Sequence, residues 1–185
     1  REMFRDDTFD RDIFYEMGEL GLFGTLVPEE YGGAGLNHVC YGLVQRDARK
    51  PTPTREVLQC LLDAGALSEF KAEFGQTLIT GFARIGGWQV GVLANEGVLF
   101  TESALKATHF IDLCCKRNVP LLFLADVSGF MVGQEAEQGG IAKAGAKFIT
   151  ARSSAAVPKF TIITGGAYGA GYLAMCGRAF RPNAM

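Results

Sequence analysis

The sequence has little of what marks the commonest metal and disulfide sites. Its 185 residues include two histidines and five cysteines, and no two cysteines are spaced as in a CxxC pair. An odd cysteine count without such a pair favours free thiols in a reducing compartment over a disulfide framework or a zinc site. We therefore expect no bound metal, and we expect the cysteines, including the adjacent Cys114 and Cys115, to be small buried side chains.

Charge and hydropathy argue against nucleic acid and membrane as partners. The formal net charge is −2, which argues against nucleic acid as the main partner. No apolar run approaches the roughly 20 residues of a membrane-spanning helix, so no membrane partner is expected. With 48% hydrophobic residues the chain can bury a substantial core. It begins at Arg1 without a signal-peptide pattern, and we expect it to be a piece of a longer protein.

The sequence pattern changes near residue 50, which divides the chain into residues 1–50 and 51–185. In the first part, a turn-rich segment over 26–35 separates two helical stretches, the second from about 38 to 49. Pro51 follows and stops that helix. The first part is too small to form a stable domain alone.

The second part predicts an α/β fold. A short helix is expected over 55–63, followed by a hairpin of strands 78–85 and 89–94 around two glycines. Strands and helices then alternate, which favours parallel strands joined by right-handed crossovers. The expected elements are strands 121–126 and 159–164 and helices 103–117, 139–156 and 167–176. The last helix is almost entirely apolar, so it should be buried.

Two glycine-rich loops, 128–133 and 165–171, are the most informative feature of the chain. Each follows an apolar strand and opens a helix, which leaves several N–H groups without an intrahelical acceptor. On neighbouring parallel strands both loops lie at the carboxyl edge of the sheet, where ligands bind. Such paired donors can hold two developing oxyanions. Tight turns and close helix packing are the alternative explanation for the glycines.

The acidic candidates each have a structural alternative. Asp126 ends a predicted strand, which is a favoured catalytic position, but its carboxylate could equally cap the turn at Ser128. Glu135 and Glu137 could form a carboxylate pair. Acidic residues at the start of a helix, however, mostly favour the helix dipole.

The basic candidates give a weaker signal. His38 and His109 are far apart in the sequence and have no evident Ser or Cys partner, so we expect surface or packing roles. Arg84 and Lys106 could contact an anionic ligand. We expect a solvated helix face from Lys143, Lys147 and Arg152.

Long segments of the second part resemble the carboxyltransferase subunit of biotin-dependent acyl-CoA carboxylases. The run 110–124 is similar to the methylcrotonoyl-CoA type within that family. The resemblance implies a crotonase-like (ClpP/crotonase) fold, with residues 51–185 forming an incomplete carboxyl-terminal domain. The matching segments are 80–85, 95–100, 128–133, 140–147, 157–159 and 168–171.

The resemblance implies carboxyl transfer from carboxybiotin, carried on a separate domain, to an acyl-CoA, preferably methylcrotonoyl-CoA. Implied partners are the biotin carrier and biotin carboxylase subunit and further copies of the carboxyltransferase subunit, in a bacterial cytoplasm or a mitochondrial matrix. The preceding domain that supplies most of the acyl-CoA site is absent, so the chain should be inactive alone. Implied backbone oxyanion donors are Gly133, Gln134, Gly169 and Ala170, and implied biotin contacts are Gly129, Phe130, Gly165, Gly166 and Tyr168.

The first fifty residues resemble a different family. Segments 17–24 and 27–36 are similar to the amino-terminal helical domain of acyl-CoA dehydrogenases of the glutaryl-CoA type. The flavin-binding middle region of that family is absent, so no flavin is expected, and the chain resembles a fusion of two fragments. Two alternatives therefore stay open: a fragment of a flavin-dependent dehydrogenase, and a non-catalytic crotonase-like fragment that serves oligomer contacts.

Overall fold

The computed structural model describes residues 53–180 and 182–185. These residues all fall within one compact unit, Val44–Met185. The dehydrogenase-like segment expected over 1–50, the helix expected over 38–49, His38 and Cys40 lie outside the described residues.

A five-stranded mixed sheet forms the centre of the described unit, with strand order β1-β2-β3-β4-β5. The first three strands pair antiparallel, and β3, β4 and β5 pair parallel. The predicted hairpin is β2–β3, and its turn is held by the Asp63 carboxylate, which accepts from the N–H groups of Gly86 and Gly87 at 2.8 and 2.7 Å. The strands are β1 Leu67–Glu69, β2 Leu78–Ile85, β3 Trp88–Asn95, β4 Leu121–Val127 and β5 Lys159–Ala167.

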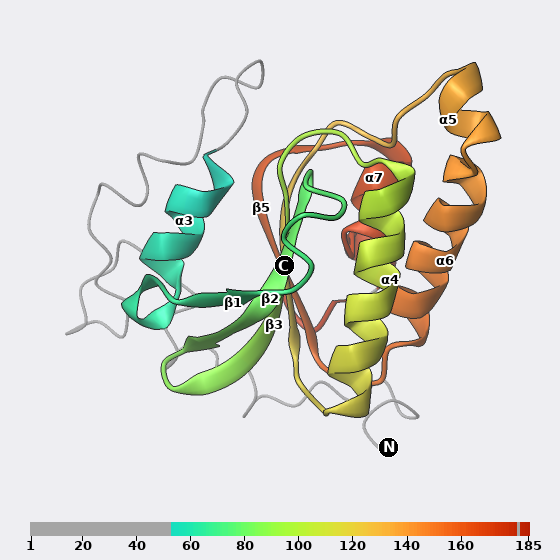
Figure 1. Ribbon diagram of the computed structural model, residues 1–185. Helices are drawn as coiled ribbons and strands as arrows, with labels where there is room; N and C mark the ends of the chain where they lie inside the picture. Colours follow the sequence, from blue (N-terminus) through green and yellow to red (C-terminus); the bar gives the residue numbers. More distant parts are fainter. Residues whose placement is uncertain (1–52, 181) are drawn as a thin grey trace. The chain divides into compact units, whose positions relative to one another are not determined.

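Helices cover both faces of the sheet. In Figure 1, α3 lies on one side of the strands, and α4, α6 and α7 lie on the other. The helices are α3 Thr54–Leu61, α4 Thr101–Lys116, α5 Gln134–Gln138, α6 Ile141–Ser154 and α7 Gly169–Ala174, with short 3₁₀ turns at Asp63–Gly65 and Arg178–Phe180. The α/β prediction is confirmed.

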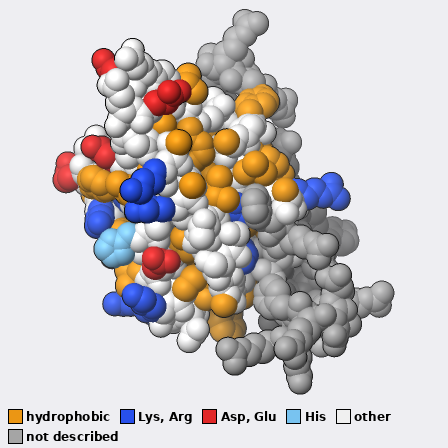
Figure 2. Space-filling view, turned by 90° about the vertical axis from the view of Figure 1, so that its right-hand side faces the viewer, with side chains coloured by type: hydrophobic (Ala, Val, Ile, Leu, Met, Phe, Trp, Pro, Cys, Tyr) orange, Lys and Arg blue, Asp and Glu red, His pale blue; other side chains and the backbone are white. Residues whose placement is uncertain are grey.

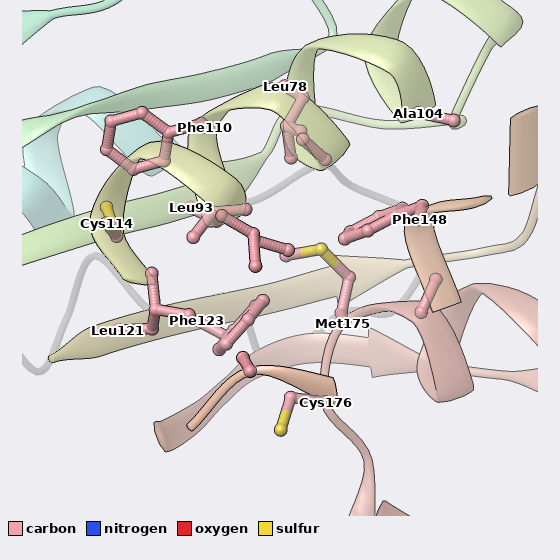
Figure 3. Packing of buried hydrophobic residues seen from close by; sticks show 14 of the residues in the cluster. Leu78, Leu93, Ala104, Phe110, Cys114, Leu121, Phe123, Phe148, Met175 and Cys176 are labelled. Atoms are coloured by element: carbon pink, nitrogen blue, oxygen red, sulfur yellow. The ribbon is translucent and has the colours of Figure 1, made fainter. Parts of the chain in front are cut away.

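Two hydrophobic clusters hold these layers together. The larger lies between the sheet and the α4, α6 and α7 side; Figure 3 shows Met175 extending towards Leu93 and Phe148. The smaller cluster joins Leu58 and Leu62, at and just after α3, to the opposite face of β2 and β3. Burying one such side chain contributes about 1.5–3 kcal/mol, so these two clusters hold the helices against the two faces of the sheet.

Glycines explain where the helices and strands depart from the sequence prediction. The helix expected over 139–156 is α6, two residues shorter at each end, and Gly140, in a left-handed conformation with φ 81°, separates it from the short helix α5. The last helix begins two residues later than expected, since β5 continues through Gly165 and Gly166 to Ala167. That helix is also exposed at its start and buried only from Gly171 onward.

The strand β1 was not predicted. Residues 67–69 form this strand, which pairs with β2 through Glu69↔Gly81. The pairing is close, because a Cβ at Gly81 would lie 2.6 Å from the carbonyl oxygen of Ser68.

The prediction of a solvated Arg152 was wrong. Arg152 is fully buried and its Nη2 donates to the carbonyl oxygen of Leu173 at 2.7 Å. It follows Phe148 by four residues and so lies on the buried stripe of α6.

Candidate functional site

Both glycine-rich segments lie at the carboxyl ends of neighbouring parallel strands, as predicted. The loop 128–133 connects β4 to α5, and β5 leads through Tyr168 into α7. Figure 1 shows these connections at the end of the sheet where α4 and α7 begin. Ligands bind at this edge in parallel α/β sheets.

The first loop is held against the connection between β3 and α4. The Leu99 N–H donates to the Gly129 carbonyl oxygen at 3.0 Å, and the Met131 N–H donates to the Leu99 carbonyl oxygen at 2.8 Å. Phe130 packs against the larger cluster, and a Cβ on Gly145 of α6 would lie 3.4 Å from its ring. The Phe130 side chain, expected on the biotin side, is therefore part of the packing beneath the loop.

The first group of donors follows this anchored loop. Gly133 has φ 120° and precedes α5, whose start has no side-chain cap. The N–H groups of Gly133 and Gln134 therefore have no intrahelical acceptor. Both residues are exposed. Met131 and Val132 are exposed beside them, Val132 to 82%.

The second group of donors follows β5. The Tyr168 N–H donates to the Val127 carbonyl oxygen at 3.2 Å, which ties the turn to the end of β4. Gly169 then takes φ 53°, and α7 begins without a side-chain cap. The N–H groups of Gly169 and Ala170 consequently have no intrahelical acceptor, and both residues are exposed.

The two segments touch each other. A Cβ on Gly171 would lie 2.6 Å from Cγ2 of Val127 and 3.0 Å from Cα of Gly129. Only glycine fits at this approach. The donor groups that precede α5 and α7 thus belong to two segments packed directly on one another, which is an arrangement that can bind negatively charged oxygens.

Gly165 and Gly166 have a different environment from the one expected. They are strand residues of β5, and the N–H of Gly166 donates to Oδ1 of Asp126 at 2.6 Å. That donor is therefore committed within the fold. Asp126 thus uses Oδ1 to bind the backbone of β5. The two roles expected from the sequence were a catalytic carboxylate and a cap of the turn at Ser128.

Asn95 is the residue that sequence reasoning missed. It is 1% exposed at the end of β3, and its Oδ1 accepts from the Asp126 N–H at 2.8 Å. Its Nδ2 donates to the carbonyl oxygens of Asp126 and Gly97. The signal for it was an amide side chain directly after the predicted strand 89–94 and two residues before Gly97.

The other described side-chain candidates, apart from the buried Lys106 and Arg152, are exposed. His109 is exposed, with Nδ1 3.1 Å from Nζ of Lys71. Arg84 donates to the carbonyl oxygen of Gly87 in the hairpin turn. Glu135 and Glu137 are exposed on α5, and Lys143 and Lys147 are exposed on α6, as predicted for a solvated face.

Lys106 differs from the expectation of an anion contact. Its side chain is fully buried in α4, and Nζ has no hydrogen-bond acceptor among the described residues. Burial lowers the pKa of this ammonium, and the charge of Glu69 partly opposes the shift. The Lys106 side chain is therefore part of the packing of α4 and is not exposed to an anionic ligand.

The described residues carry neither a metal-ligand cluster nor a membrane-spanning helix. No group of three or more His, Cys, Asp or Glu side chains within 53–180 and 182–185 could hold a metal ion. Across the same part of the chain, no helix is long and apolar enough to cross a membrane. The described cysteines Cys60, Cys114, Cys115 and Cys176 are free thiols. Cys114 and Cys176 are buried as expected, whereas Cys60 and Cys115 are only partly buried.

Comparison with known proteins extends the resemblance beyond short motifs. The sequence profile of the carboxyl transferase domain matches residues 34–185. The biotin-dependent 3-methylcrotonyl-coenzyme A carboxylase beta1 subunit of Mycobacterium tuberculosis is 56% identical over 143 residues, which cover 77% of this chain and 27% of that protein. The probable mitochondrial methylcrotonoyl-CoA carboxylase beta chain of Drosophila melanogaster is 53% identical, over 77% of this chain and 25% of its own length.

Solved structures show the same fold. The beta subunit of geranyl-CoA carboxylase from P. aeruginosa aligns with a TM-score of 0.77 and 42% identity, over 80% of this chain and 29% of that one. The transcarboxylase 12S hexamer, with hydrolysed methylmalonyl-coenzyme A bound, aligns with a TM-score of 0.76 and 39% identity, over 79% and 29%. The chain thus spans about a quarter of the length of the curated relatives it matches.

The extent of the profile match bears on the first fifty residues. The match begins at residue 34, before the boundary expected at residue 50. The resemblance of residues 1–50 to acyl-CoA dehydrogenases receives no support from these comparisons.

Proposed function

Because this chain belongs to the carboxyl transferase domain family, we propose that it forms part of the carboxyltransferase site of a biotin-dependent acyl-CoA carboxylase. The observation that carries the proposal is the direct packing of two uncapped donor segments. Gly171, on the second, approaches Gly129, on the first, too closely for a side chain. A dehydrogenase fragment is not favoured, because the chain belongs to the carboxyl transferase family. A non-catalytic fragment is not favoured, because it would not explain two adjacent segments of backbone N–H donors.

Carboxybiotin would supply the activated carboxyl group. The part of this chain is to stabilise negative charge on oxygen with fixed backbone N–H groups, which need no reorganisation when charge develops. Gly133 and Gln134 supply one pair of donors, and Gly169 and Ala170 supply the other. One such donor is typically worth about 3–4 kcal/mol of transition-state stabilisation.

The residues present fit a ligand with a polar oxygen and an apolar body. The donor positions are open, and nothing lies within 4 Å of where a Cβ would stand on Gly129, Gly133 or Gly169. Met131, Val132 and Tyr168 expose apolar surface near them, Tyr168 to 58%. These features support a biotin-side role for the two segments.

The proposed acyl substrate is methylcrotonoyl-CoA. The methylcrotonyl-specific relative is 56% identical to this chain. The geranyl-CoA and methylmalonyl-CoA proteins are 42% and 39% identical. Identity over the shared region therefore favours the methylcrotonoyl type.

The proposed partners are a biotin carrier with its carboxylase subunit and further copies of a complete carboxyltransferase subunit. The four proposed donor residues are all exposed in this chain. Oxyanion donors act strongly only where water is excluded, so another protein surface would have to cover them.

The helical face also favours a protein partner. Figure 2 shows hydrophobic side chains over the middle of the helical face and most of the charged ones towards its left margin. An apolar surface of this kind favours packing against other protein. The 12S relative forms a hexamer.

The relatives come from two kinds of compartment. They include a bacterial protein and one named mitochondrial, so we propose a bacterial cytoplasm or a mitochondrial matrix.

The test uses free carboxybiotin, methylcrotonoyl-CoA and residues 50–180 of this chain placed in a full-length relative. Carboxyl transfer to methylcrotonoyl-CoA at a rate close to that of the intact host, a relative of the methylcrotonoyl type, supports the proposal. The isolated chain serves as the comparison, and its rate should be very low because its site is exposed. A folded hybrid that transfers no carboxyl group to any acyl-CoA would overturn the proposal.

A further inference from the structure

The ladder between β4 and β5 contains a large irregularity beside the second donor segment. Ala125 pairs with Ile163, and Val127 pairs with Ala167. Two steps along β4 thus correspond to four steps along β5. The surplus on β5 falls at Thr164–Gly166, opposite Asp126. A bulge of this kind bends the strand and redirects the residues that follow it, here Tyr168 and Gly169.

The carboxylate of Asp126 occupies this irregularity. Its Oδ1 accepts the N–H of Gly166 at 2.6 Å, in place of a backbone acceptor. A Cβ on Gly165 would lie 2.3 Å from the same oxygen. The absence of a side chain at Gly165 is therefore what lets the carboxylate reach the strand.

Asp126 is itself fixed from the other side. The buried amide of Asn95 accepts from its N–H at 2.8 Å and donates to its carbonyl oxygen. One chain of hydrogen bonds therefore links the carboxyl ends of β3, β4 and β5. Its last link lies two residues before Tyr168, whose own N–H is tied to Val127.

We propose that Asp126 is a positioning residue: its carboxylate holds the β5 bulge and thereby sets the direction of the N–H groups of Gly169 and Ala170. The proposal rests on the carboxyltransferase function proposed above, in which those two groups contact a ligand oxygen. Asp126 acts through Gly166 and needs no contact with the ligand. The requirement is for an acceptor of this length, and asparagine can supply one as well.

The test compares three single variants of the full chain. Asp126→Ala removes the acceptor, and Asp126→Asn keeps one. Asp112→Ala, which removes an exposed carboxylate from α4, is the control. Hydrogen exchange of the Gly166 amide and the biotin-induced amide shifts of Gly169 and Ala170 are followed by NMR, with free biotin as the probe and global unfolding measured in parallel.

We expect Asp126→Ala to raise exchange at Gly166 and to weaken biotin binding, each by about 10-fold or more, the scale of losing one charge-assisted hydrogen bond. Asp126→Asn keeps a neutral acceptor and should show a clearly smaller change than Asp126→Ala, and Asp112→Ala should stay near the wild-type values. Unchanged exchange and unchanged biotin shifts in a folded Asp126→Ala protein would overturn the proposal, as would an Asp126→Asn protein that behaves like Asp126→Ala.

A second pair of variants tests the contact if Asp126→Ala fails to fold. Gly165→Ala places a methyl group against the carboxylate, so it should disturb the same amides while Asp126 is present. The matched control is Gly87→Ala in the hairpin turn, where no atom lies within 4 Å of the added Cβ. A folded Gly165→Ala protein with unchanged exchange at Gly166 would overturn the proposal.

Failure of the proposed function gives a different result. If the wild-type chain shows no biotin shifts and its hybrid transfers no carboxyl group, the function is overturned. Exchange at Gly166 still decides whether Asp126 holds the bulge.

Discussion

Gly171 at the start of α7 lies so close to Gly129 in the loop after β4 that a Cβ on Gly171 would stand 3.0 Å from Cα of Gly129. The same atom would stand 2.6 Å from Cγ2 of Val127. This approach brings the two donor segments into one site, because each segment limits the position of the other.

Substitution of Gly171 should therefore disturb a loop that is remote from it in sequence. We expect Gly171→Ala to lower the free energy of unfolding by about 1–3 kcal/mol, the usual cost of overpacking, and to shift the amide resonances of residues 128–133. The control is Gly87→Ala in the hairpin turn, where φ is 83° and no atom lies within 4 Å. It should cost about 1–2 kcal/mol through backbone strain and leave residues 128–133 unchanged. Similar spectra for both variants would contradict the contact.

The donor glycines should matter for rate through backbone conformation alone. Gly133 and Gly169 have φ 120° and 53°, and open space lies where a Cβ would stand. In the hybrid with a full-length relative, Gly133→Val and Gly169→Val should each lower carboxyl transfer about 100-fold or more, as expected for loss of one oxyanion donor. His109→Ala should change it far less. Near-full rates in folded glycine variants would show that the loops are only packing devices.

Cys114 should contribute to alkaline unfolding. Burial raises the pKa of this thiol to about 12, with smaller effects from Cys115 and Arg117. The unfolded chain ionises the thiol near pH 9 and the folded chain does not, so the unfolded state holds fewer protons above that pH. Stability should then fall with rising pH, by up to about 1.4 kcal/mol per pH unit from this group between pH 9 and 12.

The variant Cys114→Ala isolates that contribution. Its cavity cost is the same at every pH, so only the slope of stability against pH changes. Urea unfolding at about pH 8 and about pH 10 should show a smaller loss in the variant than in the wild type. Equal losses in the two proteins would exclude Cys114 as a source of the alkaline decline.

Lys106 should be a net cost to the fold. Its Nζ is buried without an acceptor among the described residues, and burial lowers its pKa. Lys106→Met keeps the length of the side chain and removes the charge, so we expect a gain of roughly 1–3 kcal/mol in the free energy of unfolding. The exposed Lys143→Met should change it by less than about 0.5 kcal/mol. A clear loss on Lys106→Met, measured by urea unfolding, would contradict this assignment.

The regular elements were predictable because their patterns are local. The strands Leu78–Ile85 and Leu121–Val127 read as short apolar runs, and the structure places them within one residue of the predicted bounds. The glycine loops were predictable for the same reason, since strand, glycines and helix follow one another directly. Whether their N–H groups serve as oxyanion donors stays a prediction.

The support behind the loops was not predictable. Asn95 and Asp126 are 31 residues apart, and Asp126 and Gly166 are 40 apart, so no sequence window contains both partners. The bulge in β5 exists only in relation to β4. Arg152 was misplaced because its charge was weighed above its position four residues after Phe148.

The irregular pairing of β4 and β5 also has a consequence for protein engineering. A shortened β5, lacking Gly165 and Gly166, would restore an even ladder from Ala125 to Val127 and give a more regular sheet. Tyr168 and Gly169 would then leave the sheet at another angle, and the N–H groups of Gly169 and Ala170 would no longer face the loop after β4. Backbone idealisation, which usually improves designed folds, would here exchange activity for regularity.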